Sequence, residues 1–172
     1  MAHTRPVRHP VPVPDTAIAI GPAAVSDAGV IYAIKMRAFA EEGRLSGSMD
    51  LPPLLEDVSS IELDIRTHTV LIARDGEQIV GSARGVVAGV ACQIRAVCVE
   101  PSWQGRGIGA ALLRAVETAH PDVARFELTT NTLVPGNVEF YERHGYHVVE
   151  LESFGDRITL AHLSKSASVS ES

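Results

Sequence analysis

The strongest constraint on the fold lies between Val97 and Ala119, where an apolar strand, a bend and a glycine run lead into a helix. The bend falls at Glu100-Pro101, and glycines follow it at positions 105, 107 and 109. A strand that delivers a glycine loop to a helix N-terminus presents unpaired backbone N–H groups and the positive end of the helix dipole. We therefore expect an anion-binding site here. The helix is predicted from one apolar face: Ile108, Ala111, Leu112, Ala115, Val116 and Ala119.

The length and composition describe an ordinary globular chain. With 172 residues, of which 45% are hydrophobic and 21% charged, the sequence predicts one domain with a sizeable apolar core. The formal net charge is -6, and the basic residues form no block. Because nucleic-acid binding needs a concentrated cationic surface, we expect no nucleic-acid partner.

The cysteines and the N-terminal stretch favour a reducing compartment. Cys92 and Cys98 fall on one predicted strand at a separation of roughly 20 Å, which is too far for a disulfide bond. Neither cysteines nor histidines have metal-site spacing, so no metal is expected. The stretch from Met1 to Pro14 lacks the apolar core of a signal peptide, and no apolar run approaches membrane-spanning length. We expect a cytoplasmic protein without a membrane partner.

The first third of the chain predicts a short strand, at Thr16–Ile20, and two helices. Ser26 can cap the first helix, whose apolar residues recur at helical spacing, and Pro52-Pro53 precedes a second helix at Leu54–Arg66. The polar, glycine-containing stretch from Glu41 to Met49 predicts a loop between them. The apolar residues of the first helix are Val30, Ile31, Ile34 and Ala38.

The middle of the chain predicts an antiparallel meander. Asp75-Gly76 is a strong two-residue hairpin signal, and Gly89 marks the next turn. Gly81 and Gly85, inside the second strand, indicate a bulge or close packing. The expected strands are Thr69–Arg74, Gln78–Ala88 and Ala91–Val99.

The last third predicts a crossover, a helix and a hairpin. The helix after the glycine run ends at His120-Pro121 and leads to a strand at Arg125–Thr130, which a crossover should place parallel to the last meander strand. A helix at Pro135–His144 then ends at Gly145 in a left-handed cap. The closing hairpin is expected at Tyr146–Leu151 and Arg157–Leu163.

This order predicts an α+β fold, with a mixed, mostly antiparallel sheet flanked by helices and one parallel crossover. The five prolines within residues 1–15 predict a flexible arm, and the serine-rich residues 164–172 predict a frayed tail. The domain itself is expected to span residues 16–163.

Two well-known phosphate-binding motifs fit the glycine run poorly. A P-loop needs a Lys and a Ser or Thr after its last glycine, and neither follows Gly109. Gly105-x-Gly107-x-x-Ala110 matches the dinucleotide fingerprint, but five residues, Glu100–Gln104, separate it from the strand. About twenty residues further on, where an acid should hold the ribose, stand Thr129, Thr130 and Asn131.

A third interpretation fits better. The run Gln104-x-x-Gly107-x-Gly109, preceded by Val97-Cys98-Val99-Glu100-Pro101, resembles the coenzyme A site of the GNAT superfamily of acyltransferases. The later segment from Asn137 to Tyr146 (NVEFYERHGY) resembles a second motif of that family. The expected order of strands also resembles the family's mixed sheet. The resemblance covers Ser26 to Leu163, nearly the whole chain outside the two ends.

The resemblance implies acetyl-CoA, or a related acyl-CoA, as the acyl donor. Its pantetheine arm would run along Val97, Cys98 and Val99 like an added strand, because this strand is splayed from its parallel neighbour in the family. A free backbone N–H near Val97 or Cys98 would then polarise the thioester carbonyl. Arg106 remains open as a phosphate contact or a surface charge. The pyrophosphate would lie on the backbone of Gln104, Gly105, Arg106, Gly107, Ile108 and Gly109.

By the same resemblance, Tyr141 is the expected catalytic side chain, because its phenol would contact the CoA sulfur and protonate the departing thiolate. Asn137 lies one helical turn earlier on the same face and would hydrogen-bond the CoA arm. The implied reaction is acetyl transfer from acetyl-CoA to a primary amine of a small molecule or peptide. The amine would attack directly in a ternary complex, and the resemblance also allows a homodimer.

Several points stay open at the level of sequence. The general base has too many candidates: Glu41, Glu42, His68, Glu100 and Glu127. The Cys98 thiol could carry an acyl group, but a buried core thiol is the stronger interpretation. The competing function is a non-catalytic acyl-CoA-binding domain of the same fold.

Overall fold

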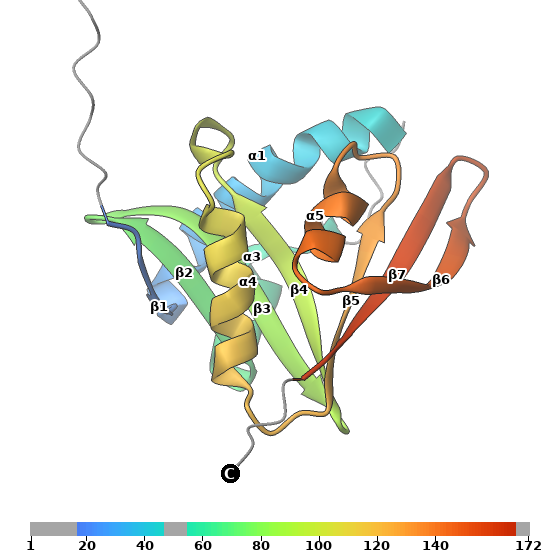
Figure 1. The fold of residues 1–172 in the computed structure, drawn as a ribbon. Helices are drawn as coiled ribbons and strands as arrows, with labels where there is room; N and C mark the ends of the chain where they lie inside the picture. The colour runs from blue at the N-terminus through green and yellow to red at the C-terminus, as the bar shows by residue number, and fades with distance from the viewer. Residues whose placement is uncertain (1–16, 47–54, 168–172) are drawn as a thin grey trace, which may run out of the picture.

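A computed structural model of the protein describes residues 17–46 and 55–167 (Figure 1). Seven strands form one sheet, whose order is β1-β2-β3-β4-β5-β7-β6. Neighbouring strands are antiparallel except for the parallel pair β4 and β5, which confirms the predicted mixed sheet. The strands are β1 (Ala19–Pro22), β2 (Thr69–Asp75), β3 (Gln78–Ala88), β4 (Ala91–Val99), β5 (Arg125–Asn131), β6 (His147–Phe154) and β7 (Ile158–Ser166).

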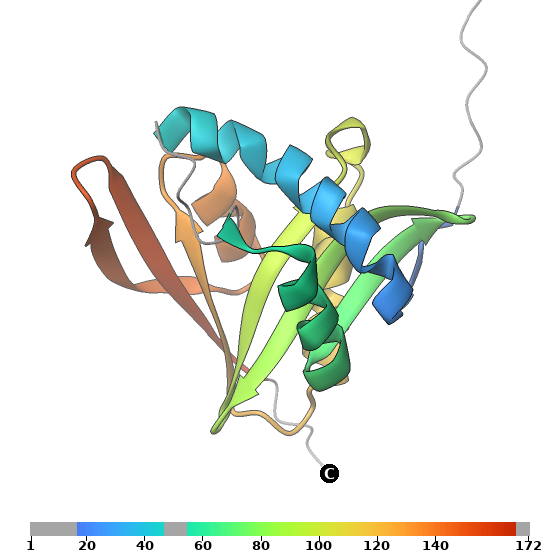
Figure 2. The same cartoon turned by 180° about the vertical axis from the view of Figure 1, so that it is seen from behind.

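Helices cover both faces of the sheet. Figure 1 shows α4 and α5 on one face, and Figure 2 shows α1 and α3 on the other. The side chains of Leu112, Leu113 and Val116 on α4 are fully buried, as are those of Ile31 and Ile34 on α1. Each such side chain contributes about 1.5–3 kcal/mol by its burial. The helices are α1 (Ala28–Ser46), α3 (Val58–Thr67), α4 (Ile108–Ala119) and α5 (Asn137–Arg143).

The glycines within β3 allow α4 to pack closely on the sheet. A Cβ at Gly85 would lie 2.8 Å from Cγ1 of Val116 and 2.8 Å from Nε2 of His120. A Cβ at Gly81 would lie 2.9 Å from the carbonyl oxygen of Cys98 on the neighbouring strand. Close packing, one of the two predicted reasons for these glycines, is therefore present at both positions.

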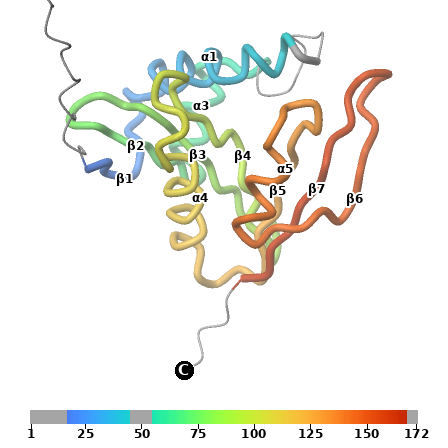
Figure 3. Tube along the Cα trace, turned by 45° about the horizontal axis from the view of Figure 1, so that its top comes forward, coloured from blue at the N-terminus to red at the C-terminus, as the bar shows by residue number. Residues whose placement is uncertain are grey.

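The parallel pair separates along its length. β4 pairs with β5 only from Ala91 opposite Arg125 to Gln93 opposite Glu127. Beyond that point β5 continues to pair with β7 as far as Asn131. Figures 1 and 3 show the two strands side by side at one end and apart at the other. This is the splay that the resemblance implied.

A bulge in β4 contributes to the separation. Arg95 lies opposite Arg84 and Cys98 lies opposite Ser82, so two residues of β4 face a single residue of β3. One of the two, Ala96, has a φ of 51°, in the left-handed region that non-glycine residues rarely adopt. An extra residue in one strand bends that strand and increases its twist. The sequence carries no glycine at this position, so the bulge was not predicted.

Several predicted boundaries were wrong. Ser26 lies in a short 3-10 turn, η1 (Val25–Asp27), and helix α1 begins after it. α1 continues to Ser46, through the stretch where a loop was expected to begin at Glu41. The ion pair between Glu41 and Arg44, one turn apart, stabilises this continuation, and one glycine costs a helix only about 1 kcal/mol.

The other differences are small. α3 begins at Val58, where Asp57 caps it by accepting a hydrogen bond from the backbone N of Ser60 at 2.9 Å, and the expected start at Leu54 lies outside the described residues. β7 runs to Ser166, so the predicted tail begins inside a strand. The predicted arm at residues 1–15 lies outside the described residues. None of the helices in the described part of the chain is long and apolar enough to cross a membrane.

Candidate active site

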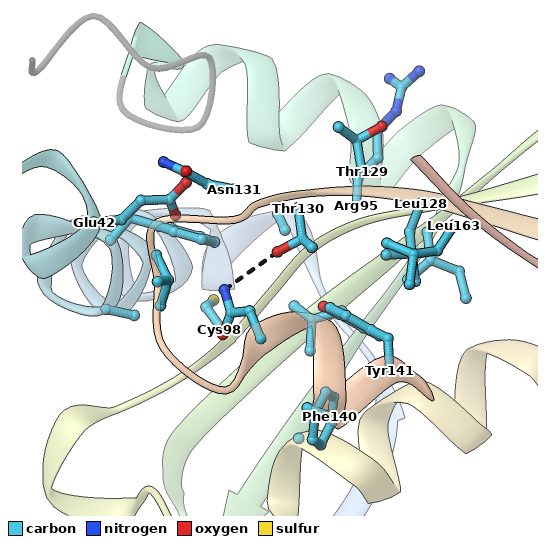
Figure 4. Close-up of a pocket in the computed structure, with 18 of the residues that line it drawn as sticks. Glu42, Arg95, Cys98, Leu128, Thr129, Thr130, Asn131, Phe140, Tyr141 and Leu163 are labelled. Atoms are coloured by element: carbon cyan, nitrogen blue, oxygen red, sulfur yellow. Dashed lines mark hydrogen bonds between the residues drawn. The ribbon is translucent and has the colours of Figure 1, made fainter. Parts of the chain in front are cut away.

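A groove of about 1230 Å³ opens where β4 and β5 separate. Its walls come from the end of β4, the glycine loop, the start of α4, and α5 on one side. The end of α1 and the strands β5, β6 and β7 provide the other walls. Figure 4 shows part of this lining, including Glu42, Cys98, Asn131 and Tyr141. The groove therefore joins the two segments that carried the family resemblance.

The glycine loop forms one end of the groove. Gly105 and Gly107 have φ angles of 78° and 80°, which a side chain would strain. Gly107 is the N-cap of α4 and offers no side chain, so the first N–H groups of the helix lack an intrahelical partner. The Gln104 side chain ties the loop to the strand, because its Nε2 donates to the carbonyl oxygen of Val99 at 3.2 Å. The guanidinium of Arg106 stacks on Trp103, with its Cζ 4.6 Å from the ring centroid.

The backbone of β4 turns its unpaired edge toward the groove near Val99. The N–H of Glu100 donates to the carbonyl oxygen of Val80 on β3 at 2.8 Å, and Cys98 also lies opposite a β3 residue in register. Backbone N–H groups alternate in direction along a strand. The N–H of Val99 therefore points away from β3, toward the gap that β5 has left, and the Val99 carbonyl oxygen, which accepts from Gln104, points the same way.

The Cys98 side chain belongs to the core under α1 and α3 rather than to the groove chemistry. It is 4% exposed, and burial raises the pKa of its thiol to about 11. At neutral pH the thiol is protonated and therefore a poor nucleophile. This burial agrees with the interpretation of Cys98 as a core residue.

Tyr141 and Asn137 both line the groove from α5. Nδ2 of Asn137 donates to the Thr130 hydroxyl at 3.2 Å, so this side chain connects α5 to β5 (Figure 4). The Tyr141 ring packs edge-on against Phe140 and Tyr146. Burial, followed by the charges of Glu42 and Cys98, raises the pKa of Tyr141 to about 12. The phenol is thus a neutral hydrogen-bond donor at physiological pH.

Glu42 is brought to the groove by the unexpected length of α1. The side chain of Asn131, a residue that is only 2% exposed, forms a hydrogen bond with its carboxylate, and Figure 4 shows the two side by side. Because Oδ1 of Asn131 already accepts from the backbone N of Leu133 at 3.0 Å, its amide NH2 is the donor toward Glu42. Burial raises the pKa of Glu42, and the hydrogen bond from Asn131 offsets part of that effect.

The other sequence-level candidates for a base are engaged elsewhere. Both oxygens of Glu100 accept hydrogen bonds from Arg37 at 2.7 Å, and this contact lowers the pKa of Glu100. Glu41 also lines the groove, but it is exposed and paired with Arg44. Glu127 is paired with Arg125, although both line the groove. His68 caps the end of α3 and is not part of the groove wall.

A buried cluster of charged side chains lies beneath α1. Glu56 accepts hydrogen bonds from Lys35 at 2.7 Å and from Arg84, and Arg84 also donates to Asp64 at 2.8 Å. Lys35 is 0% exposed. Burial favours a higher pKa for Glu56, but its two cationic partners outweigh burial and hold the pKa below the usual range. The cluster fixes the segment before α3 against β3, and sequence patterns did not indicate it.

Comparisons with known proteins identify the family. The family model described as "Acetyltransferase (GNAT) domain" matches residues 66–148. The uncharacterized N-acetyltransferase YjcF of Bacillus subtilis (strain 168) is 30% identical over 106 residues, which cover 60% of this chain and 71% of that protein. The chain belongs to the GNAT acetyltransferase family. Family membership confirms the predicted resemblance and makes this protein an acyltransferase by family.

Solved GNAT structures share the fold at low sequence identity. The ribosomal-protein-S18-alanine N-acetyltransferase of Escherichia coli superposes with a TM-score of 0.73 at 15% identity, over 90% of this chain and 97% of that one. The structure of yncA from Salmonella typhimurium with its cofactor acetyl-CoA gives a TM-score of 0.70 at 14% identity, over 91% and 97% of the two chains. These similarities confirm the GNAT fold for the described chain.

The sequence patterns did not indicate the contact between two groove residues, Thr129 and His162, or the contact of His162 with Glu152 beside the groove. The three residues lie on three different strands, and only the register of the sheet brings them together. No group of three or more His, Cys, Asp or Glu side chains within residues 17–46 and 55–167 could hold a metal ion.

Proposed function

We propose that this GNAT protein transfers an acetyl group from acetyl-CoA to a primary amine of a small molecule or peptide, by direct attack in a ternary complex. The observation that carries the proposal is one continuous groove that joins the glycine loop, the free edge of β4 and the phenol of Tyr141. The acetyl-CoA in the yncA structure supports the choice of donor.

The donor half of the groove suits an acyl-CoA. The loop from Gln104 to Gly109 and the uncapped N-terminus of α4 would hold the pyrophosphate. The pantetheine amides would pair with the free edge of β4 from Val97 to Val99. A backbone N–H near Val97 or Cys98 would stabilise the oxyanion, which is worth about 3 kcal/mol for one such donor. Tyr141 would protonate the leaving thiolate. Asn137 would form a hydrogen bond with the CoA arm.

The acceptor half of the groove suits a cation. Glu42 lies across the groove from Tyr141, and Asn131 holds its carboxylate in place. A carboxylate that is partly withdrawn from water attracts an ammonium group more strongly than an exposed one does. Because the Cys98 thiol is buried and protonated, it does not offer a covalent acyl carrier. Direct attack by the amine is the simpler route.

The test begins with binding and continues with turnover. Calorimetric titration should give micromolar affinity for CoA and none for NADH. Thiol release from acetyl-CoA is then measured with monoamines, diamines, and peptides that carry a free N-terminus or lysine. Release that depends on one class of amine supports the proposal. CoA binding without release on any amine would instead favour a non-catalytic acyl-CoA-binding domain.

A further inference from the structure

Three polar side chains form a chain of hydrogen bonds across β5, β7 and β6. Oγ1 of Thr129 lies 3.0 Å from Nδ1 of His162, its partner in register on β7. Nε2 of His162 lies 2.7 Å from a carboxylate oxygen of Glu152 on β6. Thr129 and His162 line the groove, and the His162 side chain is 33% exposed. Both ring nitrogens of His162 therefore form hydrogen bonds with side chains of the neighbouring strands.

The chemistry of the partners fixes the direction of these hydrogen bonds. An ionised carboxylate only accepts hydrogen bonds, so Nε2 of the neutral ring carries the hydrogen and donates to Glu152. Nδ1 is then an acceptor, and the Thr129 hydroxyl must donate to it. The lone pairs of the Thr129 oxygen are left to accept a hydrogen bond from a group in the groove.

Thr129 lies next to the proposed acceptor position. Thr129 and Asn131 are two residues apart on β5, so their side chains share one face of the strand about 7 Å apart. Asn131 holds Glu42 on that face, whereas Thr130 on the opposite face holds Asn137 of α5. Figure 4 shows Thr129 and Asn131 on the side of β5 away from Tyr141. An ammonium bound by Glu42 would thus lie near the Thr129 hydroxyl.

We propose that Thr129, His162 and Glu152 form a proton relay that deprotonates the acceptor amine. The proposal rests on the proposed function. One N–H bond of the ammonium breaks as its proton passes to the Thr129 oxygen, while the hydroxyl proton of Thr129 passes to Nδ1 of His162. The amine becomes neutral and its lone pair attacks the thioester, and the imidazolium is stabilised by Glu152. The partly exposed ring later returns the proton to water.

The first test separates the hydroxyl from the shape of the side chain. Initial rates are measured at saturating acetyl-CoA with the best amine from the panel. Thr129→Val should lower kcat by about 10²-fold, which is a typical loss for a proton-transfer group. Thr129→Ser, which keeps the hydroxyl, should recover most of that loss. Equal rates for Thr129→Val and the wild type would overturn the relay and leave the acetyltransferase function intact.

The second test removes the imidazole ring of His162 and supplies free imidazole in solution in its place. His162→Ala should lose a similar factor in kcat, and added imidazole should restore part of it, because the ring site is open to solvent. His147→Ala is the matched control, because His147 lies exposed on β6 outside the groove wall and should behave as the wild type. Failure of imidazole to restore His162→Ala would contradict the relay.

A third measurement does not depend on activity. Nitrogen-15 NMR of the histidine rings in the full-length protein reports which nitrogen of His162 carries the hydrogen. The relay requires the Nε2–H form in the neutral ring, and this should hold in the protein alone. An Nδ1–H ring would overturn the relay whether or not an amine is acetylated, so this result is independent of the proposed function.

Discussion

Glu42 lies close enough to Tyr141 across the groove for its negative charge to add to burial in raising the pKa of that phenol to about 12. The two groups come from α1 and α5, which cover opposite faces of the sheet (Figures 1 and 2). They meet because β4 and β5 separate between them. A neutral acid thus faces a carboxylate across the space that a thioester and an amine would fill.

Replacing Tyr141 by Phe tests the acid. We expect kcat to fall by about 10²–10⁴-fold while the affinity for CoA stays the same, because only the hydroxyl is lost. Since the pKa of Tyr141 is about 12, the phenol keeps its proton over the working range. The wild type should therefore show no loss of kcat up to about pH 10. Rate measurements from pH 6 to 10 check both expectations, and an alkaline loss confined to the wild type would contradict the second.

Glu42→Gln should weaken the binding of the amine and stabilise the folded protein at pH 7. Because the folded-state pKa of Glu42 is raised, its stabilising contribution is full below the unfolded pKa and is lost as the pH rises through the folded pKa. The variant should be more stable than the wild type at pH 7, by no more than about 1 kcal/mol because solvent screens the charge. The KM for the amine should rise about tenfold with the loss of a charged partner.

The control for this variant is Glu41→Gln. Glu41, its exposed neighbour on α1, also lines the groove, but its charge is already paired with Arg44. Thermal melts at pH 4 and pH 7 and amine titrations should leave Glu41→Gln close to the wild type. An equal effect of the two substitutions on the KM for the amine would show that general surface charge, rather than Glu42, attracts the acceptor.

The buried thiols predict how the protein responds to alkylation. Burial raises the pKa of both Cys92 and Cys98 to about 11, so iodoacetamide at pH 8 should modify neither in the folded protein. Cys98→Ala should cost about 1 kcal/mol of stability through a small cavity and keep kcat within a few-fold. Mass spectrometry and steady-state kinetics measure these outcomes. A trapped acetyl group on Cys98, with ping-pong kinetics, would refute direct transfer.

The ionic cluster under α1 predicts an asymmetric response to substitution. Glu56→Gln leaves Lys35 and Arg84 buried without a full counter-charge and should cost about 3 kcal/mol at pH 7. Because the pKa of Glu56 is lowered, this loss should shrink as the pH falls through that value. Lys35→Met leaves Glu56 paired with Arg84 and should cost less, about 1 kcal/mol. Urea denaturation at pH 7 and pH 4 compares the two variants.

Gly81→Ala should disturb the donor edge of β4. The new Cβ would lie 2.9 Å from the carbonyl oxygen of Cys98 and 3.1 Å from Cδ1 of Leu112, so the strand or the helix must move. We expect a loss of about 1–3 kcal/mol and a raised KM for acetyl-CoA. Gly21→Ala on β1 is the control, because a Cβ there meets nothing within 4 Å. Similar melting temperatures for the two variants would argue against tight packing at Gly81.

Much of the structure around the proposed donor site could be predicted because its signals are local. Each of its features is encoded by consecutive residues: the glycine run, the helix that follows it, and the segment from Asn137 to Tyr146. Backbone conformation at a glycine and apolar spacing on a helix depend on near neighbours, which the sequence lists directly. The meander and the crossover followed from turn residues and strand length in the same way.

The residues of the proposed acceptor half of the groove come together only in the tertiary structure. The interval from Glu41 to Ser46 has the composition of a loop, but it is helical in the folded chain, and only that helix carries Glu42 to Asn131. The contact of His162 with Thr129 and Glu152 depends on strand register, in which a shift of one residue would turn these side chains to the other face. The sequence by itself determined the family, the fold class and the glycine loop before α4. The charged groups of the proposed acceptor half come from distant segments, and only long-range packing brings those segments together.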